Sequence, residues 1–259
     1  MTFKLGLIPG IIGAQMKQDF WATAAEVARI GYEGLEGGGK VMEGDVAAVK
    51  EARKRLNDLG LEMPTASVSK DALGRDIRPM LEKAVAAGAQ HVSLWWAECK
   101  TREMVLADCE LFNKAGETIA EFGLKFCYHN HDHEFKNVFD GVRAIDLLFA
   151  NTDPSCVHFE IDVAWVTYGG DDPAAFLNAH KGRVPVIHLK DIADLSQRAK
   201  FTAVGTGVVK TRASVLAAVA NGARWVVVEQ DAPNVLTPME SVQASFLNIK
   251  EMGLLRDRG

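Results

Sequence analysis

The amino-acid sequence predicts an α/β fold in which eight parallel strands close into a (β/α)8 barrel. Short apolar runs, rich in β-branched and aromatic residues, alternate with amphipathic segments of helical period along the whole chain. Eight such strand–helix units share the 259 residues, and about 30 residues per unit is typical of a closed barrel. Because no proline-rich linker or change of composition interrupts the pattern, residues 1–259 are expected to form one domain.

The first four units follow a plan of apolar strand, amphipathic helix and closing glycine. Strands are expected over residues 3–9, 32–36, 61–68 and 91–96, and helices over residues 20–30, 45–59, 77–87 and 102–122. Gly31, Gly60, Gly88 and Gly123 directly follow the four helices, where a C-cap requires a positive φ. The Lys/Arg cluster of residues 45–59 is interspersed with acids at helical spacing, which indicates a solvated face rather than a nucleic-acid patch.

The last four units repeat the plan with clear helix starts. Strands are expected over residues 124–128, 156–163, 184–190 and 225–229, and helices over residues 141–150, 173–180, 211–220 and 238–252. Asp172 is the expected N-cap of one helix, with Pro173 at its first position. A doubly wound open sheet is the alternative, but the first strand leads into IPGIIG and not into the GxGxxG turn of dinucleotide-binding sheets.

Composition and charge exclude several classes of function. Hydrophobic residues make up 48% of the chain and charged residues 24%, which is ordinary for a globular enzyme. The net charge of −5 argues against nucleic-acid binding and gives no attraction to anionic membranes. No apolar run approaches the roughly 18 residues of a membrane span, and no secretory leader is expected. The four cysteines lack CxxC spacing, so we expect reduced thiols and a cytoplasmic location.

A histidine-rich stretch, LKFCYHNHDHEF, covers residues 124–135. Its apolar beginning is typical of a buried strand, and His129, His131, His133 and Glu134 follow within six positions. His129 and His131 share one face if the strand continues that far. A polar loop with chance histidines is the alternative, but this density of metal-capable groups at a strand end favours a functional site.

Polar residues also stand at the ends of most other predicted strands, where a barrel of this kind has its active site. These residues are Glu36, Glu98, Glu160, Asp162, His188, Lys190 and Glu229. Carboxylates and imidazoles converging on one mouth are costly to bury without a cation, and this ligand chemistry suits Mn²⁺, Mg²⁺, Co²⁺ or Zn²⁺. Glu36, Glu98 and Glu160 could equally serve only structural hydrogen bonds.

Five motifs resemble the xylose-isomerase-like TIM barrel superfamily, and the likeness covers nearly the whole chain. They are YHNHDHEF at 128–135, DVAWV at 162–166, GRVPVIHLKD at 182–191, VGTGVV at 204–209 and VEQD at 228–231. Together they look like the branch called sugar phosphate isomerase/epimerase.

The resemblance implies one divalent cation, with Mn²⁺ the first choice before Co²⁺, Mg²⁺ or Zn²⁺. The superfamily holds its cation with Glu, Asp, His and Glu after strands five to eight, and Asp162, His188 and Glu229 match the last three. Relatives carry the first Glu at the end of strand five, where this chain has Tyr128-His129. Glu134 is therefore the expected first ligand, narrowly preferred to His131, with His129 as a further alternative.

The resemblance also implies chemistry on a small carbohydrate that carries a carbonyl. The first expectation is an isomerase or epimerase of a keto-sugar or related polyol, acting through an enediolate; the second is a lyase or dehydratase of a 3-keto-glycoside or inosose. An endonuclease IV-like phosphodiesterase is disfavoured by the acidic charge, and a non-enzymatic sugar-binding barrel would bind no divalent ion. Neither nucleic acid nor membrane is expected as a partner, and a homo-oligomer is left open.

Roles follow for the remaining mouth residues. The candidate bases are His131, His129 and Glu160. A histidine suits this role because it titrates near neutral pH without large tuning. Lys190 is expected to neutralise a developing oxyanion. Glu36 and the aromatic residues Trp165 and Trp96, with Trp95 beside them, are the expected substrate contacts, although strand-end aromatics are also common in cores.

Overall fold

The chain folds into a parallel eight-stranded sheet that closes on itself. The computed structural model describes residues 2–233 and 235–255. The strand order is β2-β1-β12-β9-β8-β5-β4-β3, and every neighbouring pair is parallel. Isolated parallel bridges between Gly34 and Glu62 and between Gly37 and Ala66 connect the segments around β2 and β3. The strands are β1 Lys4–Leu7, β2 Gly34–Leu35, β3 Thr65–Val68, β4 His91–Leu94, β5 Lys125–His129, β8 Val157–Asp162, β9 Val186–Leu189 and β12 Trp225–Val228.

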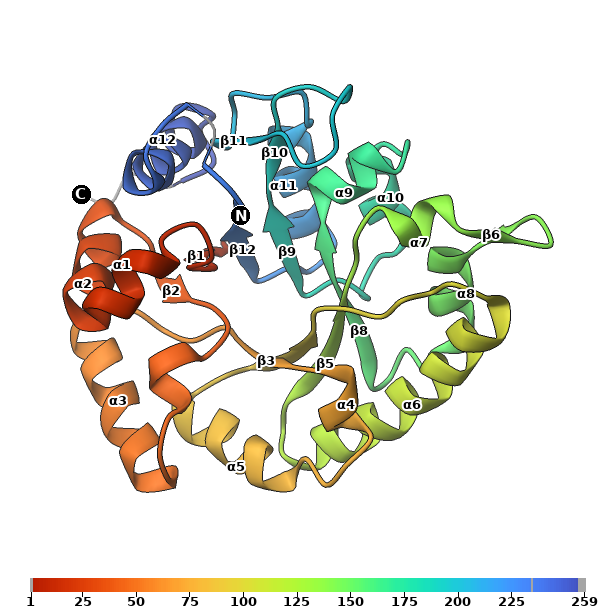
Figure 1. Ribbon diagram of the computed structural model, residues 1–259, viewed down its shortest axis with the longest axis horizontal. Helices are drawn as coiled ribbons and strands as arrows, with labels where there is room; N and C mark the ends of the chain where they lie inside the picture. The colour runs from red at the N-terminus through yellow and green to blue at the C-terminus, as the bar shows by residue number, and fades with distance from the viewer. Residues whose placement is uncertain (1, 234, 256–259) are drawn as a thin grey trace.

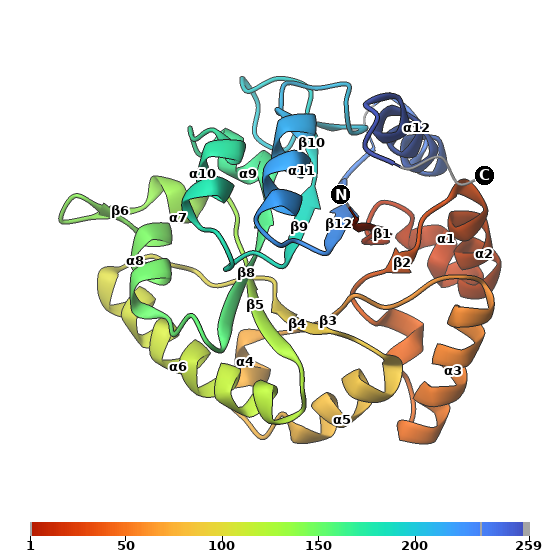
Figure 2. The ribbon, with the colours of Figure 1, turned by 180° about the vertical axis from the view of Figure 1, so that it is seen from behind.

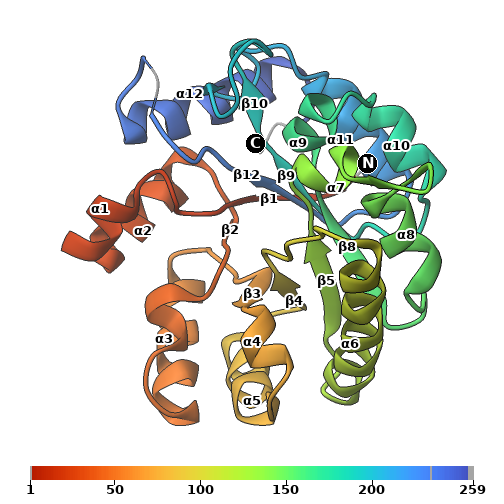
Figure 3. The ribbon, with the colours of Figure 1, turned by 45° about the vertical axis from the view of Figure 1, so that its right-hand side comes forward.

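Helices form the outer layer around this sheet. Figure 1 shows α2, α3, α5, α6 and α8 along the rim, Figure 2 shows the same ring from behind, and in Figure 3 α3, α5 and α6 stand side by side. The predicted helices are confirmed as α2 Phe20–Ile30, α3 Val46–Asp58, α5 Arg78–Ala87, α6 Arg102–Glu121, α8 Ala144–Asn151, α10 Pro173–Ala179, α11 Thr211–Ala220 and α12 Pro238–Glu251. The four predicted capping glycines all take a positive φ, and Asp172 caps α10 through Ala175 N. In the described part of the chain no helix is long and apolar enough to cross a membrane.

Short elements that the periodicity did not predict follow the strand ends. They are α1 Gly13–Gln18, the 3-10 helix η1 Gly39–Met42, α4 Lys70–Leu73, α7 His133–Lys136, α9 Val163–Tyr168, the hairpin of β6 Val138–Phe139 with β7 Val142–Arg143, and the hairpin of β10 Asp191–Ile192 with β11 Phe201–Thr202. The predicted helix over 141–150 begins only at Ala144, because residues 142–143 pair with β6. Strand β4 ends at Leu94, so Trp95 and Trp96 lie in a loop instead of the predicted strand.

The barrel interior is filled by a large aromatic residue below a polar layer. Val186, Trp225 and Val227 form a small apolar cluster of their own, apart from the main core. Gly34 leaves room for this cluster, since a Cβ there would lie 2.8 Å from the ring of Trp225. Side chains alternate along a strand, so the positions two residues further on from Val186 and Val227 face the same interior. Those positions are His188 and Glu229, which places polar groups at the carboxyl end of the barrel.

Candidate active site

The strand ends bring most of the predicted polar residues together in one buried group. Glu36 follows β2, His129 ends β5, Glu160 and Asp162 lie in β8, His188 lies in β9 and Glu229 follows β12. Except for Glu229, whose side chain is 12% exposed, all of these are buried, and Lys190 directly after β9 is buried with them. Glu98, in contrast, is half exposed beside Lys100 and lies outside the group.

His188 lies at the centre of this group, between carboxylates on both sides of its ring. Its Nδ1 is 2.7 Å from Glu229 Oε2 and its Nε2 is 2.8 Å from Glu36 Oε1. Burial alone would lower the pKa of His188, but the surrounding carboxylates outweigh it and raise that pKa well above its ordinary value. Burial, and then the charge of Glu160, raises the pKa of Glu36 to about 7.

Lys190 is the second positive charge of the site. Its Nζ lies 2.9 Å from Asp162 Oδ2 and 3.1 Å from Glu229 Oε2. Asp231, whose side chain is 45% exposed, is 3.0 Å away and adds a third carboxylate. Although burial opposes it, this set of acids raises the pKa of Lys190, so the ammonium stays charged.

Asp162 is fixed by the backbone around it. Its Oδ1 accepts hydrogen bonds from Ala164 N at 2.8 Å and Trp165 N at 3.1 Å, which caps helix α9. Its own N–H donates to Asn130 Oδ1 at 2.9 Å. One carboxylate oxygen is thereby used structurally, and Oδ2 is directed to the interior.

Four side chains of the group could hold a divalent cation. One ligand atom each from His129, Asp162, His188 and Glu229 can be chosen so that all lie within 4.8 Å of one another. Two imidazoles and two carboxylates form a donor set that suits Mn²⁺, Co²⁺ or Zn²⁺.

Charge and hydrogen bonding agree with such a cation. Four carboxylates, those of Glu36, Glu160, Asp162 and Glu229, face the two cationic groups of Lys190 and His188. The buried atoms Glu36 Oε2, His129 Nδ1 and Glu160 Oε1 have no hydrogen-bond partner among the described residues. Excess negative charge and unsatisfied ligand atoms are costly inside a protein, and a divalent cation offsets both.

Glu134, the predicted first ligand, lies elsewhere. Its fully buried carboxylate accepts hydrogen bonds from Tyr128 OH at 2.5 Å and His131 N at 2.9 Å. The reason is local: β5 continues through His129, and the turn into α7 then brings Glu134 back beside Tyr128. The side chain that groups with Asp162, His188 and Glu229 is that of His129, the alternative that the sequence placed behind Glu134 and His131.

His131 lies at the side of the cation group, among aromatic rings. Its ring centroid is 5.0 Å from that of His129, 4.8 Å from Trp96 and 5.7 Å from Trp165. Burial, then the neighbouring His129 and Lys190, lowers the pKa of His131 to about 2, so its imidazole is neutral at pH 7. Its Nδ1 is buried and has no hydrogen-bond partner among the described residues. The lone pair of Nδ1 is thus unused, although the lowered pKa makes this imidazole a weak base in the cation-free site.

The two predicted aromatic contacts differ in accessibility. Trp96 is 38% exposed, and its neighbour Trp95 is 54% exposed. Trp165 is only 3% exposed, because Lys190 and Arg198 both lie over its ring. A ring-shaped substrate can reach Trp96 directly, whereas contact with Trp165 requires Arg198 to move.

Several residues of the site were not predicted from the sequence. Ser93 on β4 donates to Glu160 Oε2 at 2.7 Å, and strand alternation on β4 could have identified it. Arg198, from the loop between β10 and β11, donates to Asp132 at 2.8 Å and covers Trp165. The loop has no periodicity, and this contact spans 66 residues, so no local signal reveals it.

The glycine-rich motif at 204–209 organises a loop. Gly205 N and Gly207 N each donate to Asp191 Oδ2 at 2.9 Å. A Cβ at Gly207 would lie 2.2 Å from Ile192 O and 2.3 Å from Asp191 Oδ1, so only glycine fits there. The motif therefore binds an internal carboxylate.

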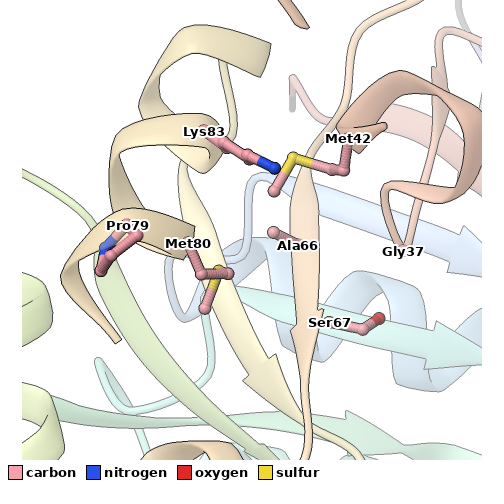
Figure 4. A pocket seen from close by; sticks show the side chains of 7 residues that line it. All are labelled: Gly37, Met42, Ala66, Ser67, Pro79, Met80 and Lys83. Atoms are coloured by element: carbon pink, nitrogen blue, oxygen red, sulfur yellow. The ribbon is translucent and has the colours of Figure 1, made fainter. Parts of the chain in front are cut away.

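A separate cavity of about 320 Å³ lies beside β3. Figure 4 shows its lining, which consists of Gly37, Met42, Ala66, Ser67, Pro79, Met80 and Lys83. Lys83 is the only charged residue of this lining. The cavity lacks the paired acids and imidazoles of the barrel mouth, so the chemistry is expected at the mouth.

Comparisons with known proteins agree with this architecture. The family model described as xylose isomerase-like TIM barrel matches residues 24–252. Inosose dehydratase from Lactiplantibacillus plantarum is 31% identical over 163 residues, which are 55% of this chain and 52% of that protein. Inosose dehydratase from Geobacillus kaustophilus is 27% identical over 210 residues, or 71% of this chain and 65% of that protein. The chain thus spans about half to two thirds of the length of these curated relatives.

Solved structures show the same fold. A sugar phosphate isomerase/epimerase from Parabacteroides distasonis superposes with a TM-score of 0.81 at 22% identity, covering 99% of this chain and 96% of that one. The IOLI protein with a bound zinc atom superposes with a TM-score of 0.72 at 12% identity, covering 96% of this chain and 98% of that one. The chain belongs to the xylose isomerase-like TIM barrel family.

Proposed function

We propose that this protein is a divalent-cation-dependent enzyme that removes the proton next to the carbonyl of an uncharged keto-polyol or keto-sugar and then eliminates water. The observation that carries the proposal is the grouping of His129, Asp162, His188 and Glu229 within 4.8 Å, with the neutral imidazole of His131 beside His129. The resemblance alone placed an isomerase or epimerase first. The similarity to inosose dehydratases now favours the dehydratase, although it covers only part of those proteins.

The cation-holding residues have defined supports. Glu36 accepts from His188 Nε2, which leaves Nδ1 of that ring for the cation and fixes the tautomer. Lys190 holds the carboxylates of Asp162 and Glu229 in place. A divalent cation, when bound there, would polarise the substrate carbonyl as a Lewis acid, and we propose Mn²⁺, Co²⁺ or Zn²⁺ in this role.

His131 is the proposed base. Its free Nδ1 accepts the proton from the carbon next to the carbonyl, and the C–H electron pair moves toward the carbonyl oxygen. The positive charge of Lys190 favours this shift of charge through space, while its ammonium stays paired with Asp162 and Glu229. The electrons then return to form a carbon–carbon double bond as the hydroxyl group on the next carbon leaves. That hydroxyl takes the proton back from His131, so one water is lost and the base is regenerated.

Pairing of the rim cations supports an uncharged substrate. Arg198 and Lys136 both contact the carboxylate of Asp132, at 2.8 and 3.0 Å. Lys190 is already held by acids. A phosphate group would have to displace one of these carboxylates, whereas the hydroxyl groups of a polyol need no such exchange. The exposed face of Trp96 can pack against the apolar side of a ring.

The isomerase or epimerase is the second candidate, because the first proton transfer is the same. If His131 returns its proton to a neighbouring carbon, the product is an isomer and no water is lost. The fold that this chain shares with the Parabacteroides distasonis sugar phosphate isomerase/epimerase is compatible with isomerisation but does not favour it over elimination.

The experiment combines cation content with product analysis. The purified protein is loaded with Mn²⁺ and incubated in deuterated water with an inosose or a 3-keto-glycoside. Loss of water from the inosose, or release of the aglycone from the 3-keto-glycoside, supports elimination, and deuterium in a recovered isomer supports the second candidate. Asp162→Asn keeps the helix-capping oxygen but should lose both cation and turnover. Glu98→Gln, which changes an exposed loop acid outside the group, is the control and should keep both. Full turnover in Asp162→Asn would refute the site.

A further inference from the structure

A second group of ligand atoms lies next to the barrel mouth and shares no residue with the first. Cys99 Sγ, a ring nitrogen of His133 and a carboxylate oxygen of Glu134 lie within 4.8 Å of one another. The side chains of Cys99 and Glu134 are fully buried, and that of His133 is 19% exposed. Cys99 lies in the loop between β4 and α6 with φ 47°, a left-handed conformation that is uncommon for a residue with a side chain. Three metal-capable groups therefore meet at a constrained loop.

The hydrogen bond of His133 fixes which ring nitrogen is free. Nε2 lies 2.8 Å from the carbonyl oxygen of Ala97, and a carbonyl only accepts, so Nε2 carries the hydrogen. Nδ1 is buried, has no hydrogen-bond partner among the described residues, and lies 3.4 Å from Glu134 Oε2. An imidazole that donates to a backbone carbonyl through one nitrogen and presents the other to a carboxylate has the arrangement of a metal ligand.

The remaining contacts orient the carboxylate. Tyr128 OH donates to Glu134 Oε1 at 2.5 Å, and His131 N donates to Oε2 at 2.9 Å. The same phenol oxygen is 3.9 Å from Cys99 Sγ. Tyr128 thus holds both the carboxylate and the thiol in place, as supporting residues do around a bound cation.

We propose that Cys99, His133 and Glu134 form a second cation site, selective for Zn²⁺ or a cation of similar chemistry. The separation of 3.4 Å between His133 Nδ1 and Glu134 Oε2 matches the edge of a tetrahedron with Zn–N and Zn–O bonds of about 2.1 Å. A thiolate ligand favours Zn²⁺ or Co²⁺ over Mn²⁺ and Mg²⁺. The partial exposure of His133 gives the cation an entry path and leaves a corner for water.

A cation at this site would join the loop after β4 to helix α7. The loop carries Trp96, whose ring lies 4.6 Å from that of His133 and 4.8 Å from that of His131. The second site would therefore fix the exposed tryptophan beside the proposed base. Its chemistry is distinct from that of the mouth, where none of His129, Asp162, His188 and Glu229 is a thiol.

Cobalt loading tests this proposal without an activity measurement. The purified protein is stripped with a chelator, titrated with Co²⁺, and assayed for bound cobalt and for a thiolate-to-cobalt charge-transfer band. The wild type should bind two cobalt ions per chain and show the band. Asp162→Asn should bind one and keep the band, and this outcome holds even if the proposed reaction is wrong.

Variants of the second site give the opposite pattern. Cys99→Ser should bind one cobalt ion and lose the band, and Glu134→Gln should weaken cobalt binding at this site while the thiol remains. Cys109→Ser removes another buried cysteine outside the group and should change neither the amount of bound cobalt nor the charge-transfer band. Circular dichroism checks that each variant is folded. A wild type without the band, or a band that persists in folded Cys99→Ser, would overturn the proposal.

Discussion

Replacing Glu36 by glutamine tests how the cation site is supported. The carboxylate is 4% exposed, and its Oε1 lies 2.8 Å from Nε2 of His188. It is not among the four proposed ligands but bonds directly to one of them, so we expect it to act through the His188 ring. Glutamine keeps an acceptor of almost the same shape but removes the negative charge. Alanine removes the acceptor as well.

The expected size of the effect follows from this contact. Loss of a hydrogen-bonded partner of a metal-binding histidine typically weakens metal affinity by about 10–100-fold, or about 1.4–2.7 kcal/mol. A charge-assisted hydrogen bond is roughly twice as strong as a neutral one. We therefore expect Glu36→Gln to lie near the lower limit and Glu36→Ala near the upper one.

Isothermal titration calorimetry with Mn²⁺ at a fixed pH measures the effect. Glu98→Gln, outside the site, is the matched control and should bind Mn²⁺ like the wild type. Wild-type affinity in Glu36→Ala would show that His188 is not oriented by this carboxylate. An equal loss of Mn²⁺ affinity in the control would show that the loss comes from the change in net charge and not from the contact with His188.

Three further predictions concern charge, pH and backbone. Lys190→Met leaves buried carboxylates unpaired and should destabilise the metal-free protein by about 3–5 kcal/mol in urea unfolding, whereas the exposed Lys54→Met should have little effect. The pKa of His188 is raised when no cation is bound, so a cation must replace a proton on this ring. Cation binding should therefore release protons and weaken as the pH falls. Calorimetry that finds a pH-independent affinity would contradict this prediction. Gly207→Ala should cost about 1–3 kcal/mol of thermal stability, because the added Cβ would lie 2.2 Å from Ile192 O, whereas Gly10→Ala, with open space around it, should be tolerated.

The barrel and the grouping of Asp162, His188 and Glu229, three of the proposed cation ligands, could be predicted because their signals are local. Apolar runs with closing glycines located the strands and helices, and period two along β8 placed Glu160 and Asp162 on one face. His188 and Glu229 follow the same logic on neighbouring strands. Parallel strands share one carboxyl edge, so residues at successive strand ends must meet.

The fourth proposed ligand could not be chosen from the sequence, because the choice depends on where a strand ends. Had β5 ended before His129, a ligand from the following loop, such as Glu134, could have reached the cation. The structure instead extends β5 through His129, and the next turn brings Glu134 to Tyr128. Sequence periodicity identifies strands well but leaves their ends uncertain by some residues.

The sequence also does not reveal which loop residues cover the side chains of the site. Trp165 was expected to face the substrate, yet it is almost fully buried beneath Arg198. That cover depends on an ion pair between Arg198 and Asp132, which are far apart in sequence. A loop without periodicity carries no signal for such a partner.

Locating the bound cation itself tests the central claim most directly. Crystals of the wild type grown with Mn²⁺ can be measured at the manganese absorption edge, where anomalous scattering marks the ion. We expect one anomalous peak among His129, Asp162, His188 and Glu229, with Glu36 still bonded to Nε2 of His188. A peak held by Glu134 in place of His129 would contradict the ligand assignment, and the absence of any peak at the barrel mouth would contradict the proposed enzyme.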